Sequence, residues 1–112
     1  MSIKLERINS NIVKELSYIL AQEIKDENIK FVTVTDCKVT NDLSFAKIYI
    51  RVFDLDKIDT TLKALDKAKG FIKKMLSERI DIRHIPELQF VYDESLEEGK
   101  KIEDIISEIH NK

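Results

Sequence analysis

The sequence predicts an α+β domain in which helix dominates, with the order helix, strand, strand, helix, helix, strand and a short closing helix. Apolar residues recur at helical spacing in three parts of the chain, and β-rich runs separate these parts. The 112 residues include only 2 Gly and 1 Pro, which disfavours a many-turned sandwich or barrel. Since 43% of the residues are hydrophobic, the chain can bury a core, and we expect residues 1–112 to form a single domain.

The first helix is predicted over residues 4–25. Its apolar residues recur every three or four positions and form one stripe, which consists of Leu5, Ile8, Ile12, Leu16, Ile19 and Leu20. The period changes over residues 31–35, where β-branched and aromatic residues favour a strand. The polar pair Asn41-Asp42 separates this strand from a second β-rich run over residues 45–53, so we expect an antiparallel hairpin.

Side chains of the second strand alternate between two faces. We assign to the core the apolar set Ala46, Ile48, Ile50 and Val52. The opposite face combines aromatic rings with cations: Phe45, Lys47, Tyr49, Arg51 and Phe53. Such a face could stack bases, but we favour an outer face whose rings pack on loops and whose charged groups are solvated.

The helical period returns after Asp56, whose carboxylate is expected to cap the first turn. The apolar stripe continues on both sides of Ala68-Lys69-Gly70 and comprises Ile58, Leu62, Leu65, Ile72, Met75 and Leu76. A glycine at this place can stop a helix in left-handed conformation. It can also let a backbone or a phosphate approach the start of the next helix, and both roles can hold together.

Pro86 closes the helical region and precedes a third strand over residues 87–92, which has Leu88, Phe90 and Tyr92 on one face. Residues 93–112 are acidic and are predicted to form the closing helix, with Ser95 as its N-cap. Its apolar stripe is Ile102, Ile105, Ile106 and Ile109. We expect this helix to pack on the body of the domain.

The formal net charge of −2 conceals a polarised distribution. Residues 60–86 have 7 basic and 3 acidic side chains, whereas residues 87–112 have 3 basic and 8 acidic ones. The basic side chains of the first segment surround the glycine break and are Lys63, Lys67, Lys69, Lys73, Lys74, Arg79 and Arg83. Together with the order of the elements, this concentration favours a nucleic-acid partner over an ordinary lysine-rich surface.

Nothing in the sequence indicates catalysis. The histidines, His84 and His110, are not spaced from Cys37 as a base is from a nucleophile, and no phosphate-binding glycine loop is present. The acidic cluster Asp93, Glu94, Glu97 and Glu98 fits a solvated helix cap better than a cation site, so a hydrolase is the least favoured hypothesis. We expect no enzyme activity, no cofactor and no metal.

The single cysteine, Cys37, cannot form an internal disulfide, which suits a reducing cytoplasm. Charged residues interrupt the apolar positions of the first 25 residues, so we expect neither a signal peptide nor a membrane-spanning helix. We therefore expect a cytoplasmic protein with no membrane partner.

The predicted element order is that of a type II KH domain, in which a GXXG loop between two helices grips the backbone of a single strand. Ala68-Lys69-Gly70 stands at the place of that loop. With this departure, the chain resembles the ribosome-binding factor A family, bacterial assembly factors of the small ribosomal subunit, over residues 5–106. The matching stretches are Arg7-Ile8-Asn9-Ser10-Asn11-Ile12 with Glu15-Leu16, Val32-Thr33-Val34-Thr35, Asp42-Leu43 with Ala46-Lys47-Ile48-Tyr49-Ile50, Ala68-Lys69-Gly70-Phe71-Ile72-Lys73, Arg79-Ile80-Asp81-Ile82-Arg83-His84-Ile85-Pro86-Glu87-Leu88, and Asp93-Glu94-Ser95 followed by Gly99-Lys100-Lys101-Ile102.

The resemblance implies a non-catalytic, KH-like RNA-binding factor that associates with free, immature small subunits and assists late maturation and processing of their rRNA. Family members are linked to growth in the cold and to assembly GTPases. Ala68 in place of the first loop glycine favours a kinked helix pair, which recognises RNA by shape and phosphate charge. The RNA-binding residues that we expect are Lys63, Lys67, Ala68, Lys69, Gly70, Lys73, Lys74, Arg79 and Arg83.

The alternative is a KH-like protein-interaction module that docks a ribosomal protein or an assembly GTPase through Phe45, Tyr49 and Phe53. We expect a monomer, because no long apolar stripe is left without a core to face. The acidic residues 87–112 are expected to point away from RNA.

Overall fold

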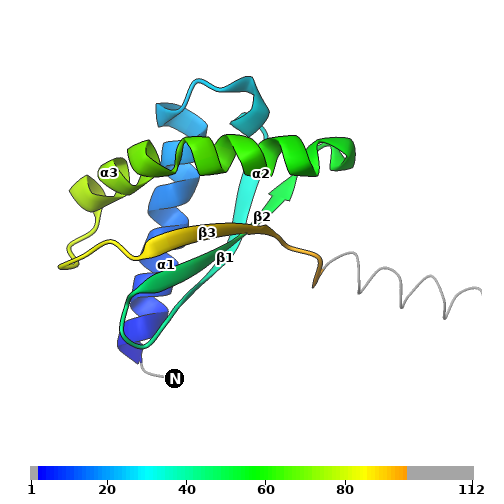
Figure 1. Ribbon diagram of the computed structural model, residues 1–112. Coiled ribbons are helices and arrows are strands. Elements are labelled where there is room, and N and C mark those ends of the chain that lie inside the picture. Colours follow the sequence, from blue (N-terminus) through cyan, green and yellow to red (C-terminus); the bar gives the residue numbers. More distant parts are fainter. Residues whose placement is uncertain (1–2, 96–112) are drawn as a thin grey trace, which may run out of the picture.

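The structure is a computed structural model that describes residues 3–95. Its elements are α1 (Ile3–Tyr18) with a π-helical turn (Ile19–Glu23), a 3₁₀ turn (Glu27–Ile29), β1 (Val32–Val39), β2 (Phe45–Val52), a 3₁₀ turn (Leu55–Lys57), α2 (Ile58–Lys67), α3 (Lys69–Arg79) and β3 (Glu87–Tyr92) (Figure 1). The predicted α+β class and the order of the first six elements are confirmed. The closing helix was predicted within residues 93–112. Residues 96–112, which include its isoleucine stripe, lie outside the described part of the chain.

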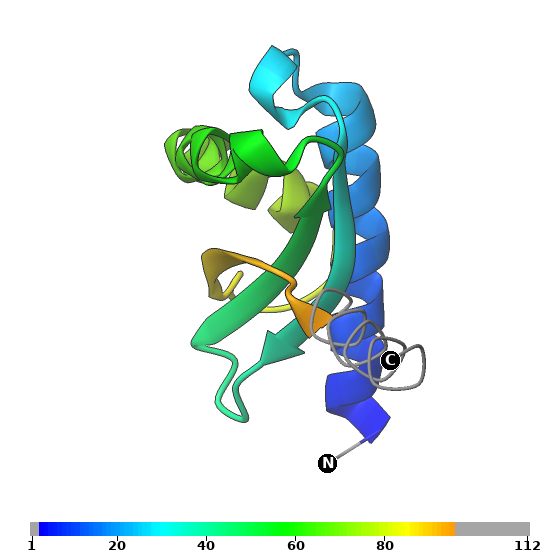
Figure 2. The same ribbon diagram turned by 90° about the vertical axis from the view of Figure 1, so that its right-hand side faces the viewer.

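The three strands form one sheet in the order β1-β2-β3, with β2 in the centre. β1 and β2 are antiparallel, which confirms the predicted hairpin, and β3 runs parallel to β2 from Phe45↔Glu87 to Ile50↔Tyr92. Ala46, Ile48 and Ile50 are fully buried, so the predicted core face of β2 is correct. Figure 2 shows the hairpin running beside α1, which packs against β1.

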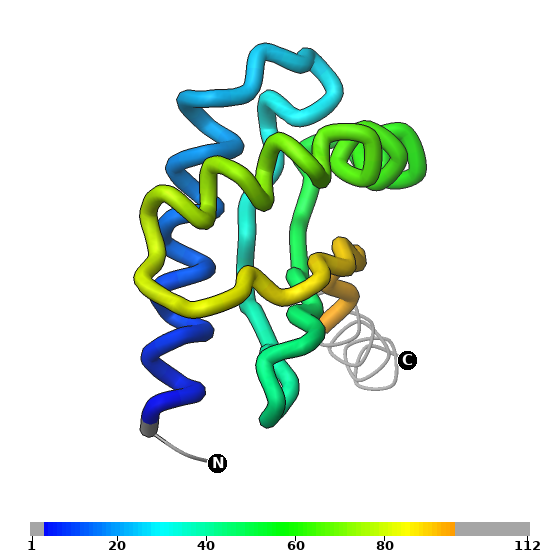
Figure 3. The backbone as a smooth tube through the Cα atoms, turned by 60° about the vertical axis from the view of Figure 1, so that its left-hand side comes forward, coloured from blue at the N-terminus to red at the C-terminus, as the bar shows by residue number. Residues whose placement is uncertain are grey.

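The helices α2 and α3 connect the parallel strands β2 and β3. Parallel neighbours cannot be joined by a tight turn, so the chain must cross back over one face of the sheet. Figure 1 shows the two helices following each other almost in line, and Figure 3 shows α3 crossing α1. The side chains between these helices and the sheet form the core, whose fully buried members include Ile12, Leu16, Ile48, Ile50, Leu65, Ile72, Leu76 and Leu88.

The edge strand β1 ends at Val39, four residues beyond the predicted range of 31–35, and a bulge lies between Val34 and Asp36. Two side chains accept hydrogen bonds from amides of the strand: Cys37 N–H donates to Asp36 Oδ1 (2.8 Å) and Val39 N–H to Asn9 Oδ1 (2.9 Å). Satisfied amides protect an edge strand against pairing with another chain. Burial raises the pKa of the Cys37 thiol to about 12, so it stays protonated inside the core.

Asp42 organises the turn between β1 and β2. One of its oxygens, Oδ1, accepts from the Ser44 hydroxyl (2.7 Å), the Thr40 hydroxyl (2.8 Å) and the Ser44 amide (3.0 Å). Leu43, the next residue, has a φ of 62°, which is unusual for a residue with a side chain. The hydrogen bonds to Asp42 therefore stabilise a turn that includes a left-handed leucine.

Two local predictions were wrong. Asp56 does not cap α2, because a 3₁₀ turn comes first and the Asp54 carboxylate accepts from the Asp56 amide (3.0 Å). Gly70 is not left-handed, because it lies inside α3 and no glycine among residues 3–95 has a positive φ. The amides that a Ser95 N-cap would bind lie outside the described residues; the Ser95 amide itself donates to Asp93 Oδ1 (2.9 Å).

The Leu65 side chain is fully buried between α2 and the sheet, whereas Leu55 is 54% exposed. We expect Leu65→Ala to lower the free energy of unfolding by about 2–5 kcal/mol, since it removes buried methyl groups and leaves a cavity. Leu55→Ala should change it by no more than about 0.5 kcal/mol. Urea denaturation of both variants measures the difference, and equal losses would contradict this core assignment.

The hydrogen bond from the Ser44 hydroxyl, followed by that from Thr40, holds the pKa of Asp42 at about 2, below its usual value of 3.8. The carboxylate therefore contributes stability that is complete above pH 3.8 and is lost as the pH falls to about 2. We expect the free energy of unfolding to fall less steeply over this range in Asp42→Asn than in the wild type. Identical pH profiles of the two proteins, from denaturation at each pH, would contradict the role of Asp42.

Candidate nucleic-acid interface

The structure leaves three lysines of α2 and α3 exposed and without an ion pair among residues 3–95: Lys63, Lys67 and Lys74. Lys63 and Lys67 lie one helical turn apart, as do Gly70 and Lys74. Helical hydrogen bonding continues across the break, because the Ala68 amide donates to Ala64 O (3.0 Å) and the Ile72 amide to Ala68 O (2.9 Å). The three side chains therefore follow one another along one side of the helix pair, which we call the lysine stripe (Lys63, Lys67 and Lys74).

Ala68 is the only residue that interrupts the helix pair, with a φ of −86° and a ψ of 0°. This small departure from helical angles gives a kinked pair, as the sequence predicted, and not an open loop. A Cβ atom built on Gly70 meets nothing within 4 Å, and its φ is not positive. Among residues 3–95, therefore, neither a steric neighbour nor a positive φ requires a glycine at this position. Because Gly70 has no side chain, its backbone is open to an approaching ligand.

Two other predicted site lysines have partners within the fold. Lys69 Nζ lies 3.5 Å from Asp66, one turn earlier, and Lys73 Nζ lies 3.1 Å from Glu87 at the start of β3. These pairs are partly exposed, so water screens them and they leave much of the positive field in place. Lys69 and Lys73 therefore add charge beside the lysine stripe. Arg83, the last predicted site residue, is exposed in the loop after α3.

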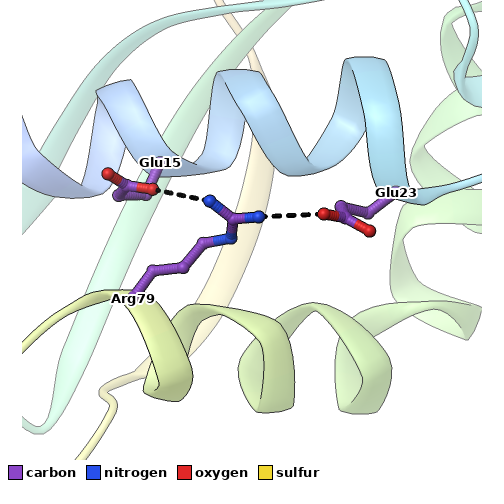
Figure 4. A network of polar contacts seen from close by, with 3 residues as sticks. All are labelled: Glu15, Glu23 and Arg79. Atoms are coloured by element: carbon purple, nitrogen blue, oxygen red, sulfur yellow. Dashed lines mark hydrogen bonds and ion pairs between the residues drawn. The ribbon is translucent and has the colours of Figure 1, made fainter.

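Arg79 joins α3 to α1 (Figure 4). Its guanidinium donates to Glu23 (2.8 Å) and Glu15 (3.4 Å), and it lies over the Tyr18 ring, 4.3 Å from the centroid. A planar guanidinium suits such a position, since it can bond two carboxylates and stack on a ring. Arg79 thus holds the helix pair against α1, a role that the sequence analysis did not predict. The sequence contained one sign of this role. Arg79 follows the buried Leu76 by three positions, which places it beside the buried face of α3.

Asp93, a member of the predicted acidic cluster, is engaged in structural contacts. The Thr35 hydroxyl donates to Asp93 Oδ2 (2.6 Å), and the Arg51 guanidinium donates to the Asp93 carbonyl (3.0 Å). Hydrogen bonds from the Ser95 side chain and then Thr35 hold the pKa of this carboxyl below its usual range. The side chains of residues 3–95 include no group of three or more acidic, histidine or cysteine residues arranged to hold a metal. No helix in the same range is long and apolar enough to cross a membrane.

The outer face of β2 differs from its prediction. Its rings were expected to pack on loops, yet Phe45 is 57% and Phe53 is 87% exposed. Phe31, which the sequence analysis placed in the first strand, precedes β1 and is 66% exposed. Its ring centroid lies 6.0 Å from that of Phe53. Phe31 and Phe53 therefore form an exposed aromatic pair. The pair could not be predicted from the sequence, because it depends on the register of the hairpin.

Comparison with known proteins identifies relatives over almost the whole chain. The family model described as "Ribosome-binding factor A" matches residues 4–106. A ribosome-binding factor A of Staphylococcus carnosus is 50% identical over 111 residues, which cover 98% of this chain and 96% of the relative. The Staphylococcus epidermidis protein of the same name is 48% identical over 110 residues, covering 97% and 95%.

Solved structures agree on the fold. The crystal structure of ribosome-binding factor A from Thermus thermophilus superposes with a TM-score of 0.72 at 22% identity, covering 79% of this chain and 94% of that one. A Thermus thermophilus model fitted into a cryo-EM map of a complex between the 30S subunit and this factor gives 0.66 at 22% identity, covering 77% and 91%. The fold is KH-like, as predicted, and the chain belongs to the ribosome-binding factor A family.

Proposed function

We propose that this protein binds the small ribosomal subunit by placing the α2–α3 pair against rRNA, and that it assists late maturation and rRNA processing on free, immature subunits without catalysing a reaction. The observation that carries the proposal is the lysine stripe beside the bare backbone of Gly70. The choice of partner is supported by a Thermus thermophilus relative, a model of which has been fitted into the map of a complex with the 30S subunit.

The geometry favours recognition of the RNA backbone over recognition of bases. Each lysine supplies a mobile point charge that contacts a phosphate and releases counterions, which makes binding sensitive to salt and tolerant of sequence. With no side chain at Gly70, a phosphate can come close to the helix backbone between Lys67 and Lys74. We therefore assign RNA contact to Lys63, Lys67, Gly70 and Lys74, with Ala68, Lys69, Lys73 and Arg83 around them, and a supporting role to Arg79.

The proposal extends to the other expectations from the family resemblance. It includes action as a monomer in the cytoplasm, release with the help of assembly GTPases and a contribution to growth in the cold. An alternative, docking of a ribosomal protein or a GTPase through Phe45, Tyr49 and Phe53, is favoured by the exposure of the two phenylalanines.

Neutralising the lysine stripe should weaken binding and also change its dependence on salt. Each phosphate contact contributes about 0.7–0.9 to the slope of log affinity against log salt concentration. The triple variant Lys63→Gln/Lys67→Gln/Lys74→Gln is therefore expected to lower the magnitude of that slope by about 2–3. Sedimentation with purified small subunits at several salt concentrations measures it.

A matched control is Lys4→Gln/Lys14→Gln/Lys25→Gln, which removes the same charge from exposed positions on and just after α1. We expect the control to keep the slope of the wild type. Equal slopes for the two triple variants would remove the helix pair from the RNA interface. A wild type that does not sediment with small subunits would refute the proposed function itself.

Substitution of Gly70 should separate stability from binding. Because Gly70 is helical and its Cβ position is open, Gly70→Ala is expected to raise the free energy of unfolding by about 0.5–1 kcal/mol. Gly70→Gln should also fold. It should bind small subunits more weakly, because the glutamine side chain fills the space through which RNA would approach the backbone. Ser10→Gln, at an exposed position of α1, is the control, and equal binding of the two glutamine variants would contradict close approach at Gly70.

A further inference from the structure

The sheet face turned away from the helices carries an alternating row of rings and cations. Ala46, Ile48 and Ile50 of β2 point into the core with no exposed surface, so the residues between them point to the opposite face. These residues and their continuation past the strand are Phe45, Lys47, Tyr49, Arg51 and Phe53. A cation therefore separates each ring from the next along the strand. We call this surface, with Lys38 of β1, the open sheet face.

Lys38, Lys47 and Tyr49 converge at the middle of this face. Lys38 and Lys47 are direct cross-strand partners, and their ammonium groups lie 5.6 and 6.0 Å from the Tyr49 ring centroid. Neither lysine forms an ion pair within residues 3–95. Like charges directly opposite each other destabilise a sheet. The contacts with the Tyr49 ring offset part of this repulsion, and an anion placed between the two ammonium groups would stabilise the pair further.

The only acidic residue of β1 and β2 does not neutralise the two lysines. Asp36 pairs with Tyr49 across the strands, and its Oδ1 accepts from the Cys37 amide at 2.8 Å. Arg51 adds a cation at a fixed position, because it donates to the Asp93 carbonyl and lies over the Tyr92 ring, 5.4 Å from the centroid. The hairpin strands therefore present a positive surface on the open sheet face.

Exposed rings lie at both ends of this positive surface. Phe45 is exposed at one end, and Phe31 and Phe53 form a tilted pair at the other, where Lys30 lies 5.6 Å from the Phe31 centroid. A cavity of about 340 Å³ beside this pair is lined by Lys30 and Lys57 and also by the carboxylates of Glu27 and Asp54, so it adds no net positive charge. Aromatic rings that are interleaved with cations on a sheet match single-stranded nucleic acid, whose bases stack on the rings while its phosphates contact the cations.

We propose that the open sheet face is a second RNA-binding surface, which takes an extended single-stranded segment with a base on Tyr49 and phosphates on Lys38 and Lys47. This inference rests on the proposed function, because it assigns a further rRNA contact to the same factor. It is distinct from the helix pair, since α2 and α3 cover the other face of the sheet. A protein partner fits this face less well, because two lysines without carboxylate partners occupy its centre.

The test uses the full chain, a fluorescein-labelled single-stranded RNA of ten nucleotides with mixed sequence, and purified small subunits. Tyr49→Leu keeps an apolar side chain but removes the stacking ring, and we expect it to lose about fivefold or more in RNA affinity. Lys38→Gln/Lys47→Gln should lose RNA affinity while its resistance to urea stays equal or rises, because the variant removes a like-charge pair. Lys4→Gln/Lys14→Gln, on the exposed side of α1, is the charge-matched control.

Ultraviolet cross-linking to small subunits, followed by peptide mapping, locates the contact directly. RNA cross-links on residues of β2, with loss of affinity in both sheet variants, would support the proposal. If both variants bind the RNA and the subunits like the wild type, the proposal is overturned while the proposed function stands. Cross-links from this face to a ribosomal protein, with RNA affinity unchanged, would assign it to protein docking instead. A wild type that binds neither partner would refute both proposals.

Discussion

The parallel pairing of β3 with β2 is the constraint on which the rest of the structure depends. It requires the chain to return across the sheet, and α2 and α3 make that crossing on the face that α1 also covers. One face of a three-stranded sheet is thereby filled with apolar side chains, and the other is left to polar and aromatic ones. The exposed side of the crossing helices and the open sheet face are therefore both products of the same topology.

Most of the fold could be predicted from periodicity. The stripe of α1, the alternation of β2 and the run Leu88–Phe90 of β3 each reflect burial on one face, so the pattern of apolar residues was sufficient. The end of β1 could not be predicted, because the bulge after Val34 shifts the alternation by one residue. The prediction that Asp56 caps α2 failed for a similar local reason. Asp54, two residues earlier, is an equally good capping residue, and it is the one that accepts from the Asp56 amide.

The candidate site was predictable only in part, because a count of charges cannot show which charges are already paired. The partners of Lys73 and Arg79 come from β3 and α1, far away in sequence, so only the fold separates them from the lysine stripe. Lys38 was missed for the same reason, since its position opposite Lys47 depends on the register of the hairpin. The local composition was sufficient to identify the basic region. Only the tertiary structure shows which of its side chains form ion pairs within the fold.

Because Ala68 alone interrupts the helix pair, the proposed RNA contact would be made by a surface whose backbone is already ordered. An open loop would have to be ordered when RNA arrives, at a cost in backbone entropy. The lysines of a nearly continuous helix pair are held in place before RNA binds. Binding would therefore cost little backbone entropy, and mainly the entropy of the lysine side chains. In the proposed complex, each lysine contact would be weak and would exchange readily with ions, so dissociation would require no unfolding. A factor built in this way can engage its target rapidly and leave it intact.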